Sequence, residues 1–231
     1  MPQTTLTLIS SMATKALLAD LVAAFAQQQP GTTVAVTSVG GVDAAKRVVA
    51  GEAFDIVALA SDAIARLAAS GHVVADTRAD LVHSAVAVAV PAGAPVPDIG
   101  TEAALKAAVL AAPTLGYSTG PSGVQLAALF ERWGIAQQIA PRIVTPPPGV
   151  SVGSLVARGE VALGFQQLSE MMGVPGIQVI GGLPEAVQIV TTFSAARASL
   201  SQQAAAVQAF LDFAASPATA ELKQRHGMMP A

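Results

Sequence analysis

Serine residues follow each of the first three predicted strands of this 231-residue chain, and two glycines join them after the second strand. Such residues can bind an anion, because backbone N–H groups at a helix start have no intrahelical acceptor and carry partial positive charge. Each group stands just before a predicted helix, so the ordinary alternative is that each hydroxyl caps its own helix. The residues are Ser10 and Ser11, then Ser38 with Gly40 and Gly41, then Ser61.

The second half of the chain has the same arrangement. Neutral hydrogen-bonding groups end or follow its predicted strands: Tyr117, Ser118, Thr119, Gly120, Ser122, Ser151, Gln166 and Gln167. Ligands of open α/β sheets bind beyond the carboxyl ends of the strands, and the deepest crevice of a two-lobed protein lies between its lobes. We therefore expect these loops to share one cleft that binds a small anion through hydroxyls and helix-start amides.

Few side chains are placed to act as catalytic groups. Lys15, one turn into the first predicted helix, and Tyr117 are the candidates for holding a carboxylate or moving a proton. An ordinary surface lysine is the alternative for Lys15. Lys46 and Arg47 are further candidates, but their spacing from Asp43 favours pairing along a helix face.

Composition argues against several other classes of protein. The chain has no Cys and only three widely spaced His, so disulfides, thiol chemistry and a metal site are not expected. Lys and Arg number 12 against 15 Asp and Glu, without a basic cluster, which argues against a nucleic-acid partner. Ser122 lies outside a Gly-x-Ser-x-Gly motif, so a serine hydrolase is not expected, and no motif calls for a cofactor.

Strand, loop and helix alternate along the chain, which predicts an α/β protein with mostly parallel sheets flanked by helices. Long β-runs, one ending at Val90 and one at 187–193, divide the chain into two lobes joined by two hinge crossings. We assign residues 1–83 and 193–231 to lobe one and residues 84–192 to an inserted lobe two. Asp43 is the predicted N-cap of one helix, and another is predicted at 124–133.

The apolar segments are too short to span a membrane. Mean hydropathy is +0.57, yet each apolar run is broken before the ~18 residues that a span needs, so membrane insertion is not expected. No signal peptide is recognised ahead of the first strand. A periplasmic location is expected if such a peptide has been removed, and a cytoplasmic one otherwise.

Several motifs resemble the periplasmic molybdate-binding proteins and the wider type II periplasmic solute-binding fold, in the same order and over nearly the whole chain. They are Ser10-Ser11, residues 43–51 followed by Asp55-Ile56-Val57, Ser61-Asp62, residues 154–160 leading to Gly164-Phe165, and residues 216–230. The resemblance implies two lobes that close on a small anion by hinge motion. It also implies a monomer that delivers an oxyanion or a small carboxylate to the permease of an ABC importer.

The resemblance further implies how the anion is held. Molybdate binders use a serine after the first strand, a second-loop serine, backbone amides of the second lobe and a tyrosine. Ser11, or Ser10, matches the first serine. Gly41 or Val42 stands where the second hydroxyl should be, and Gln167 replaces the tyrosine. These departures favour a larger, flatter anion such as a carboxylate.

Aconitate isomerase, a relative of this family, is built on the same fold and converts a tricarboxylate. The chain is similar to it as well. A second function therefore stays open, namely the isomerisation of an unsaturated polycarboxylate in the same cleft.

Overall fold

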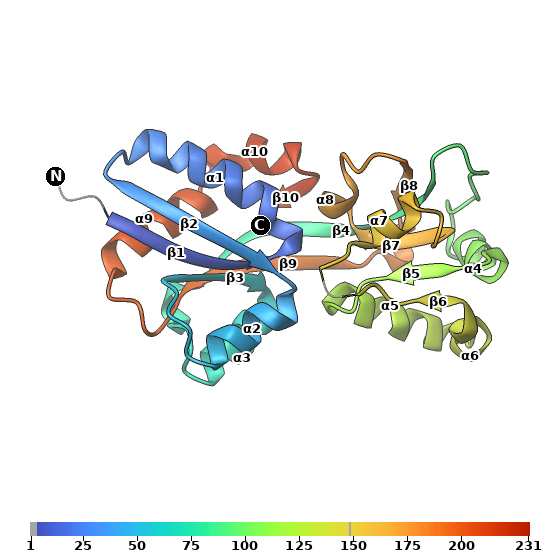
Figure 1. Cartoon of the computed structure of the whole chain (residues 1–231), viewed down its shortest axis with the longest axis horizontal. Helices are drawn as coiled ribbons and strands as arrows, with labels where there is room; N and C mark the ends of the chain where they lie inside the picture. Colours follow the sequence, from blue (N-terminus) through green and yellow to red (C-terminus); the bar gives the residue numbers. More distant parts are fainter. Residues whose placement is uncertain (1–3, 148) are drawn as a thin grey trace. The chain divides into compact units, whose positions relative to one another are not determined.

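The structure is a computed structural model of the chain, and it describes residues 4–147 and 149–231. The chain forms two compact units, both drawn in Figure 1. Unit 1 comprises Met1–Ser84 and Thr192–Ala231, and unit 2 comprises Ala85–Thr191. Two strands, β4 (Ala79–Pro91) and β9 (Val190–Arg197), contribute residues to both units. The mixture of sheets and flanking helices is the α/β class that the sequence predicts.

The sheet of unit 1 contains three parallel strands. Besides β4 and β9, its strands are β1 (Thr4–Ser11), β2 (Thr32–Val39), β3 (Ile56–Ala60) and β10 (Met228–Pro230). Their order is β2-β1-β3-β9-β4, and β10 pairs with β4. β2 and β3 run parallel to β1, whereas β9 is antiparallel to β3 and β10 is antiparallel to β4.

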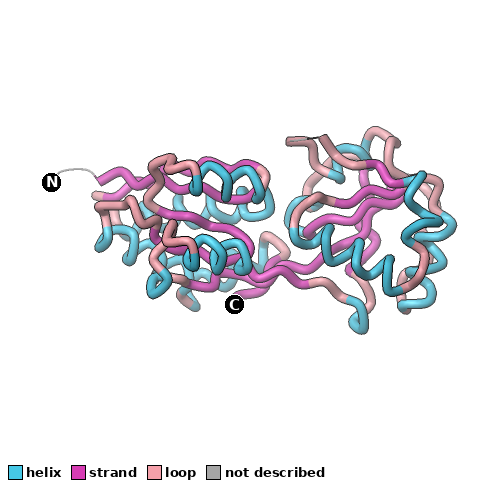
Figure 2. The backbone as a smooth tube through the Cα atoms, turned by 90° about the horizontal axis from the view of Figure 1, so that it is seen from below, coloured by secondary structure: helices cyan, strands magenta, loops and turns pink. Residues whose placement is uncertain are grey.

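Helices cover both faces of the unit 1 sheet, as Figure 2 shows. The face of Leu6 and Leu8 is covered by α1 (Lys15–Gln28), α9 (Ala204–Ala215) and α10 (Ala220–Arg225). The face of Ile9 is covered by α2 (Gly41–Val49) and α3 (Ser61–Ala69). Successive side chains of a strand point to opposite faces, so the single apolar run of β1 serves both cores.

Unit 2 has its own sheet and core. Its strands, besides its part of β4, are β5 (Leu115–Tyr117), β6 (Ile143–Val144), β7 (Leu163–Gln167) and β8 (Ile177–Gly182). The order is β4-β7-β5-β6, with β5 parallel to β6 and β7, and with β7 and β8 antiparallel to β4. The two ends of this unit meet, because Val86 N donates a hydrogen bond to Ile189 O at 2.9 Å.

The helices of unit 2 also lie on both faces of its sheet. One face is covered by α4 (Glu102–Ala111) and α5 (Pro121–Arg132), and α6 (Ala136–Ile139) follows α5. The other face is covered by α7 (Val152–Ala157) and α8 (Leu168–Met171). Short 3-10 helices complete the two units: η1 (Met12–Thr14), η2 (Ala75–Thr77), η3 (Ala140–Arg142), η4 (Glu185–Val187) and η5 (Pro217–Thr219).

Three predicted element boundaries are wrong. The helix predicted at 124–133 begins at Pro121, because proline fits the first helical position, where no N–H donor is needed. The strand predicted at 187–193 begins at Val190, because η4 occupies residues 185–187. The helix with the predicted N-cap Asp43 begins at Gly41, because β2 extends to Val39 and a single residue separates strand from helix.

No helix within the described parts of the chain is both long and apolar enough to cross a membrane. The longest helix, α1, has its buried side chains on one stripe, at Leu17, Leu18, Leu21 and Phe25. Phe25 meets Phe210 of α9 edge-on, with ring centroids 5.3 Å apart. This is the pattern of an amphipathic helix that packs on a protein core.

Asp55 joins three segments of unit 1 at the start of β3. Its Oδ2 accepts hydrogen bonds from Thr7 N at 2.8 Å and Thr7 Oγ1 at 3.0 Å. Its Oδ1 accepts a hydrogen bond from Ser201 Oγ at 2.6 Å. The carboxylate thereby holds β3 in place beside β1.

We expect Asp55→Ala to lower the free energy of unfolding by about 2–4 kcal/mol, because the Thr7 amide and the Ser201 hydroxyl lose their acceptor. Denaturant unfolding measures this loss. Asp62→Ala is the matched control, since the Asp62 carboxylate pairs with Arg66 on an exposed helix surface at 2.7 Å. Its effect should stay below about 0.5 kcal/mol, and equal losses in the two variants would contradict the role of Asp55.

Candidate functional site

The carboxyl ends of β1, β2 and β3 meet at one edge of the unit 1 sheet (Figure 1). The parallel register places Ser10 opposite Ser38 of β2 and opposite Ala58 of β3, and it places Ser11 opposite Val39. The hydroxyls of Ser10 and Ser38 lie 2.8 Å apart and share a hydrogen bond. The structure thus brings together two of the strand ends that the sequence marks as ligand-binding.

The Ser11 hydroxyl is buried and has no hydrogen-bond partner among the described residues. Ser11 is 7% exposed. It precedes η1, and its carbonyl accepts a hydrogen bond from Thr14 Oγ1 at 3.3 Å, but its side chain makes no capping bond. A buried polar atom without a partner costs free energy, so such an atom in a folded protein needs an explanation. An oxygen atom of a bound anion would accept its hydrogen bond.

Backbone amides without a helical acceptor lie close to Ser11, at the start of α2. No side chain caps this helix, and the first backbone hydrogen bond runs from Ala44 N to Gly40 O at 2.8 Å. A Cβ on Gly41 would lie 3.6 Å from the Ser11 Cβ, so the first turn of α2 is adjacent to that hydroxyl. Asp43 was predicted to be the N-cap, but it lies within the first turn of α2, and Gly40 is the N-cap residue.

The remaining candidates of unit 1, Ser61, Lys15 and Lys46, lie within helices. Ser61 is the first residue of α3, directly after β3, and is half-buried. Lys15 is the first residue of α1, Lys46 lies in α2, and both are exposed. Neither lysine forms an ion pair within residues 4–147 and 149–231.

The spacing of Arg47 from Asp43 predicted an ion pair between them, but Arg47 pairs with Glu52 instead. Its Nε donates a hydrogen bond to Glu52 Oε2 at 2.6 Å, and its guanidinium carbon lies 5.4 Å from the ring centroid of Phe54. The chain turns back after α2 at Gly51, where φ is 82°, and this turn brings Glu52 to Arg47. The guanidinium is therefore engaged in a local contact at the far end of α2.

In unit 2, the loop between β5 and α5 is packed tightly on the first turn of the helix. The hydroxyls of Ser118 and Ser122 lie 3.3 Å apart and share a hydrogen bond. A Cβ on Gly123 would lie 1.6 Å from the Ser118 carbonyl oxygen, so only glycine fits there. Thr119 is exposed, and Gly120 is the N-cap residue of α5.

Gly123→Ala should therefore displace this loop and lower the free energy of unfolding by about 1–3 kcal/mol, the usual cost of overpacking. Gly31→Ala is the control, because no atom lies within 4 Å of a Cβ at Gly31. Thermal unfolding of both variants gives the comparison. A Gly123→Ala protein as stable as Gly31→Ala would show that the loop is not packed as described.

Ser151 caps its own helix, α7, as an ordinary N-cap serine does. Its Oγ accepts a hydrogen bond from Ser154 N at 3.1 Å and lies 2.8 Å from Ser154 Oγ. This hydroxyl is already engaged at the start of α7. A ligand role for Ser151 therefore requires it to share its hydrogen bonds.

The two glutamines at the end of β7 are both buried and have different partners. Gln166 Oε1 accepts from Gly153 N at 3.2 Å. Gln167 Nε2 donates to Thr191 Oγ1 at 2.9 Å, while Gln167 Oε1 is buried without a partner in the described structure. Gln167 is 3% exposed. Like Ser11, it therefore keeps an unsatisfied polar atom at a position where the resemblance implies a ligand contact.

Glu170, on α8, is a titratable residue of this region that no sequence motif marks. Its Oε1 accepts a hydrogen bond from Gln166 Nε2 at 2.9 Å. Burial raises the pKa of the Glu170 carboxyl from its ordinary value of 4.5 to about 7, and the hydrogen bond from Gln166 opposes this shift. The spacing of four residues between Gln166 and Glu170 across a strand end is the only sequence signal that could have identified it.

This pKa predicts a specific pH dependence of stability. The pKa is higher in the folded state, so as pH rises from 4.5 to about 7 the unfolded chain releases this proton first and stability falls. The free energy of unfolding of the wild type should drop by about 1–3 kcal/mol between pH 5 and pH 8 relative to that of Glu170→Gln. Urea unfolding at both pH values tests this, and parallel pH curves for the two proteins would contradict it.

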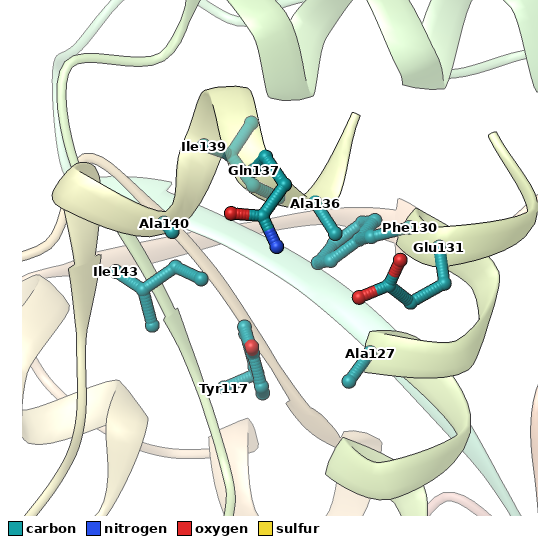
Figure 3. A pocket seen from close by; sticks show the side chains of 9 residues that line it. All are labelled: Tyr117, Ala127, Phe130, Glu131, Ala136, Gln137, Ile139, Ala140 and Ile143. Carbon is teal, nitrogen blue, oxygen red and sulfur yellow. The ribbon is translucent and has the colours of Figure 1, made fainter. Parts of the chain in front are cut away.

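Tyr117 lines a pocket of about 200 Å³ within unit 2, between α5 and α6 (Figure 3). Its ring packs edge-on against Phe130 at a centroid distance of 5.9 Å, and burial raises the pKa of its hydroxyl. The side chains of Glu131 and Gln137 also point into this pocket. None of the strand-end serines or glutamines lines this pocket, although Tyr117 precedes Ser118 in the chain and pairs with Phe165 beside Gln166.

No group of three or more His, Cys, Asp or Glu side chains in the described ranges could hold a metal ion. The unsatisfied atoms of the candidate site are a hydroxyl and an amide oxygen, together with free backbone N–H groups. The hydroxyl and the backbone N–H groups can donate hydrogen bonds to an anion, whereas the amide oxygen of Gln167 can only accept one from a donor.

Comparisons with known proteins agree over nearly the full length of the chain. A family model described as bacterial extracellular solute-binding protein matches residues 6–229. An aconitate isomerase from Pseudomonas sp. is 37% identical over 235 residues, covering 99% of this chain and 89% of that protein.

Solved structures of similar fold include periplasmic and ABC transporter substrate-binding proteins. The periplasmic molybdate-binding protein of Azotobacter vinelandii superposes with a TM-score of 0.79 at 18% identity, covering 97% of this chain and 98% of that one. An ABC transporter substrate-binding protein from Bradyrhizobium japonicum gives a TM-score of 0.73 at 14% identity, covering 99% and 83%. At such identities the likeness shows the type II periplasmic binding-protein fold, as expected from the sequence.

Proposed function

The chain belongs to the bacterial extracellular solute-binding protein family, and from this premise we propose that it binds a small unsaturated polycarboxylate and isomerises it. The observation that carries the proposal is the 37% identity to an aconitate isomerase across 99% of the chain. The molybdate-binding protein is only 18% identical, so its ligand carries little weight here.

The chemistry of the candidate site supports a carboxylate ligand. In unit 1, the unpartnered Ser11 hydroxyl lies beside the free amides of α2, and such donors bind carboxylate oxygens without a cationic side chain. Val42 is 52% exposed and offers no hydroxyl at the position where a molybdate binder has one. Ser10, Ser38, Gly40, Gly41 and Ser61 of the same edge, and Ser118, Gln166 and Gln167 of unit 2, are the further ligand-binding residues of this proposal.

Isomerisation of an aconitate-type substrate is a proton shift across three carbons. A base removes a proton from the methylene carbon beside a carboxylate, and the C–H electron pair becomes the new double bond. The electrons of the original double bond take up a proton at the far carbon. Atoms and electrons balance without an oxidant or a cofactor, so the protein must supply binding, orientation and one group that exchanges a proton.

A second candidate function is the solute-binding component of an ABC importer. The family description favours it, as does the ABC transporter substrate-binding protein among the similar structures. This function places the protein outside the cytoplasm and requires it to bind and release a small anion unchanged. The two candidates share a ligand class and differ in turnover.

A proton NMR time course with cis- or trans-aconitate distinguishes them. We expect signals of the other isomer to appear with the wild-type protein, because the proposed site binds and reprotonates the substrate. Line broadening without a new isomer would favour the importer component. A response to molybdate or sulfate alone would contradict the carboxylate assignment.

Replacing Ser11 tests the binding part of the proposal. Ser11→Ala removes a buried donor to an ionised ligand, so the dissociation constant for aconitate should rise about tenfold or more. Ser199→Ala is the control, because Ser199 is an exposed serine of the same unit. Calorimetric titration gives both constants, and equal affinities would remove Ser11 from the site.

A further inference from the structure

We propose that Glu170 is the general base of this isomerisation, taking the proton from the substrate methylene and returning it to the far carbon. The inference rests on the proposed function and names the residue that performs its chemical step. No other carboxyl group of unit 2 in the described residues contacts one of the predicted ligand-binding residues through a hydrogen bond.

The topology of unit 2 places Glu170 at the edge of the sheet where the loops of the site lie. β5 and β7 run parallel, so the Ser118 loop after β5 and helix α8 after β7 leave the sheet at the same edge (Figure 1). Gln166 reaches the backbone of α7 at Gly153, which begins beyond the same edge. The hydrogen bond from Gln166 therefore fixes Glu170 among the strand ends of this unit.

One carboxyl oxygen of Glu170 is anchored and the other is available. Oε1 accepts the hydrogen bond from Gln166, whereas Oε2 makes no hydrogen bond within the described chain. Glu170 is half-buried, so the protein does not fully enclose this side chain. An oriented carboxyl with one free oxygen is the arrangement that a general base needs.

No cation neutralises this carboxyl from the elements packed around it. Leu168 and Met171 of α8 pack on β4 and β8, and Gln166 links Glu170 to β7 and to α7. Residues 85–91 of β4, the whole of β7, β8 and α7 carry no titratable or charged side chain. Arg158 and Glu160, the nearest charged residues after α7, pair with each other at 2.5 Å.

Because it lacks a cation, Glu170 exchanges its proton near neutral pH. Burial raises its pKa to about 7, so both forms are populated at neutral pH. A base of this strength can accept a proton in one half of the shift and release it in the other. A carboxylate paired with Arg or Lys would have a lowered pKa and would therefore accept the proton less readily.

The test compares the wild type with Glu170→Gln, which keeps an acceptor for Gln166 but cannot take a proton. We expect kcat/KM for aconitate to fall by about 10²–10⁴-fold. The dissociation constant for propane-1,2,3-tricarboxylate, which has no double bond to shift, should stay within about threefold of the wild-type value. Glu160→Gln is the matched control, an exposed carboxyl of the same unit, and should keep the wild-type rate.

The pH profile supplies a second measurement. Wild-type kcat/KM should rise through an apparent pKa near 7 and level off above it, and this step should be absent from the residual activity of Glu170→Gln. Ionisation of the substrate is common to both proteins and cancels in their ratio. Glu170→Asp should restore part of the rate with the same form of profile, which keeps the test decisive if Glu170→Gln folds poorly.

The outcomes separate the two proposals. A Glu170→Gln protein that isomerises aconitate at the wild-type rate overturns the role of Glu170 and leaves the isomerase function standing. A wild type that binds aconitate without converting it overturns both. Loss of turnover together with loss of tricarboxylate binding would mean that Glu170 supports the binding site, which also overturns its role as the base.

Discussion

Parallel pairing of strands is the constraint on which the candidate site depends. In unit 1 the register of β1 against β2 and β3 sets Ser10, Ser38 and Ser11 at one edge, and in unit 2 the pairing of β5 and β7 does the same for their loops. A shift of one residue would turn these side chains to the opposite face of the sheet. Asp55 strengthens the register, because it binds the backbone and hydroxyl of Thr7.

Two of the residues proposed to bind the ligand carry unsatisfied polar atoms rather than charges. Ser11 and Gln167 each keep a buried polar atom without a partner, and the third such atom in the described structure belongs to Ser84. Folding leaves such atoms unpaired at a cost, which a ligand offsets by supplying the missing hydrogen bond. A site of this kind distinguishes ligands by where their oxygens and hydrogens lie, so shape and protonation state matter more than total charge.

The alternation of strands and helices, and the strand ends that carry hydroxyls, can be predicted from the sequence, because periodicity and turn residues are local signals. The cap of α2 and the partner of Arg47 cannot, since they depend on where β2 ends and on the turn at Gly51. Glu170 is missed for a similar reason. Its environment is made by Gln166 and by apolar strands distant in sequence, and these strands give no local signal of burial.

Unit 2, Ala85–Thr191, is one continuous stretch of chain, and its two ends are joined by a hydrogen bond between Val86 and Ile189. A segment with adjoining ends can be spliced between two strands of a host without stretching either of them. The chain has the organisation that such an insertion would produce, because the sequence of unit 2 lies between the two segments of unit 1.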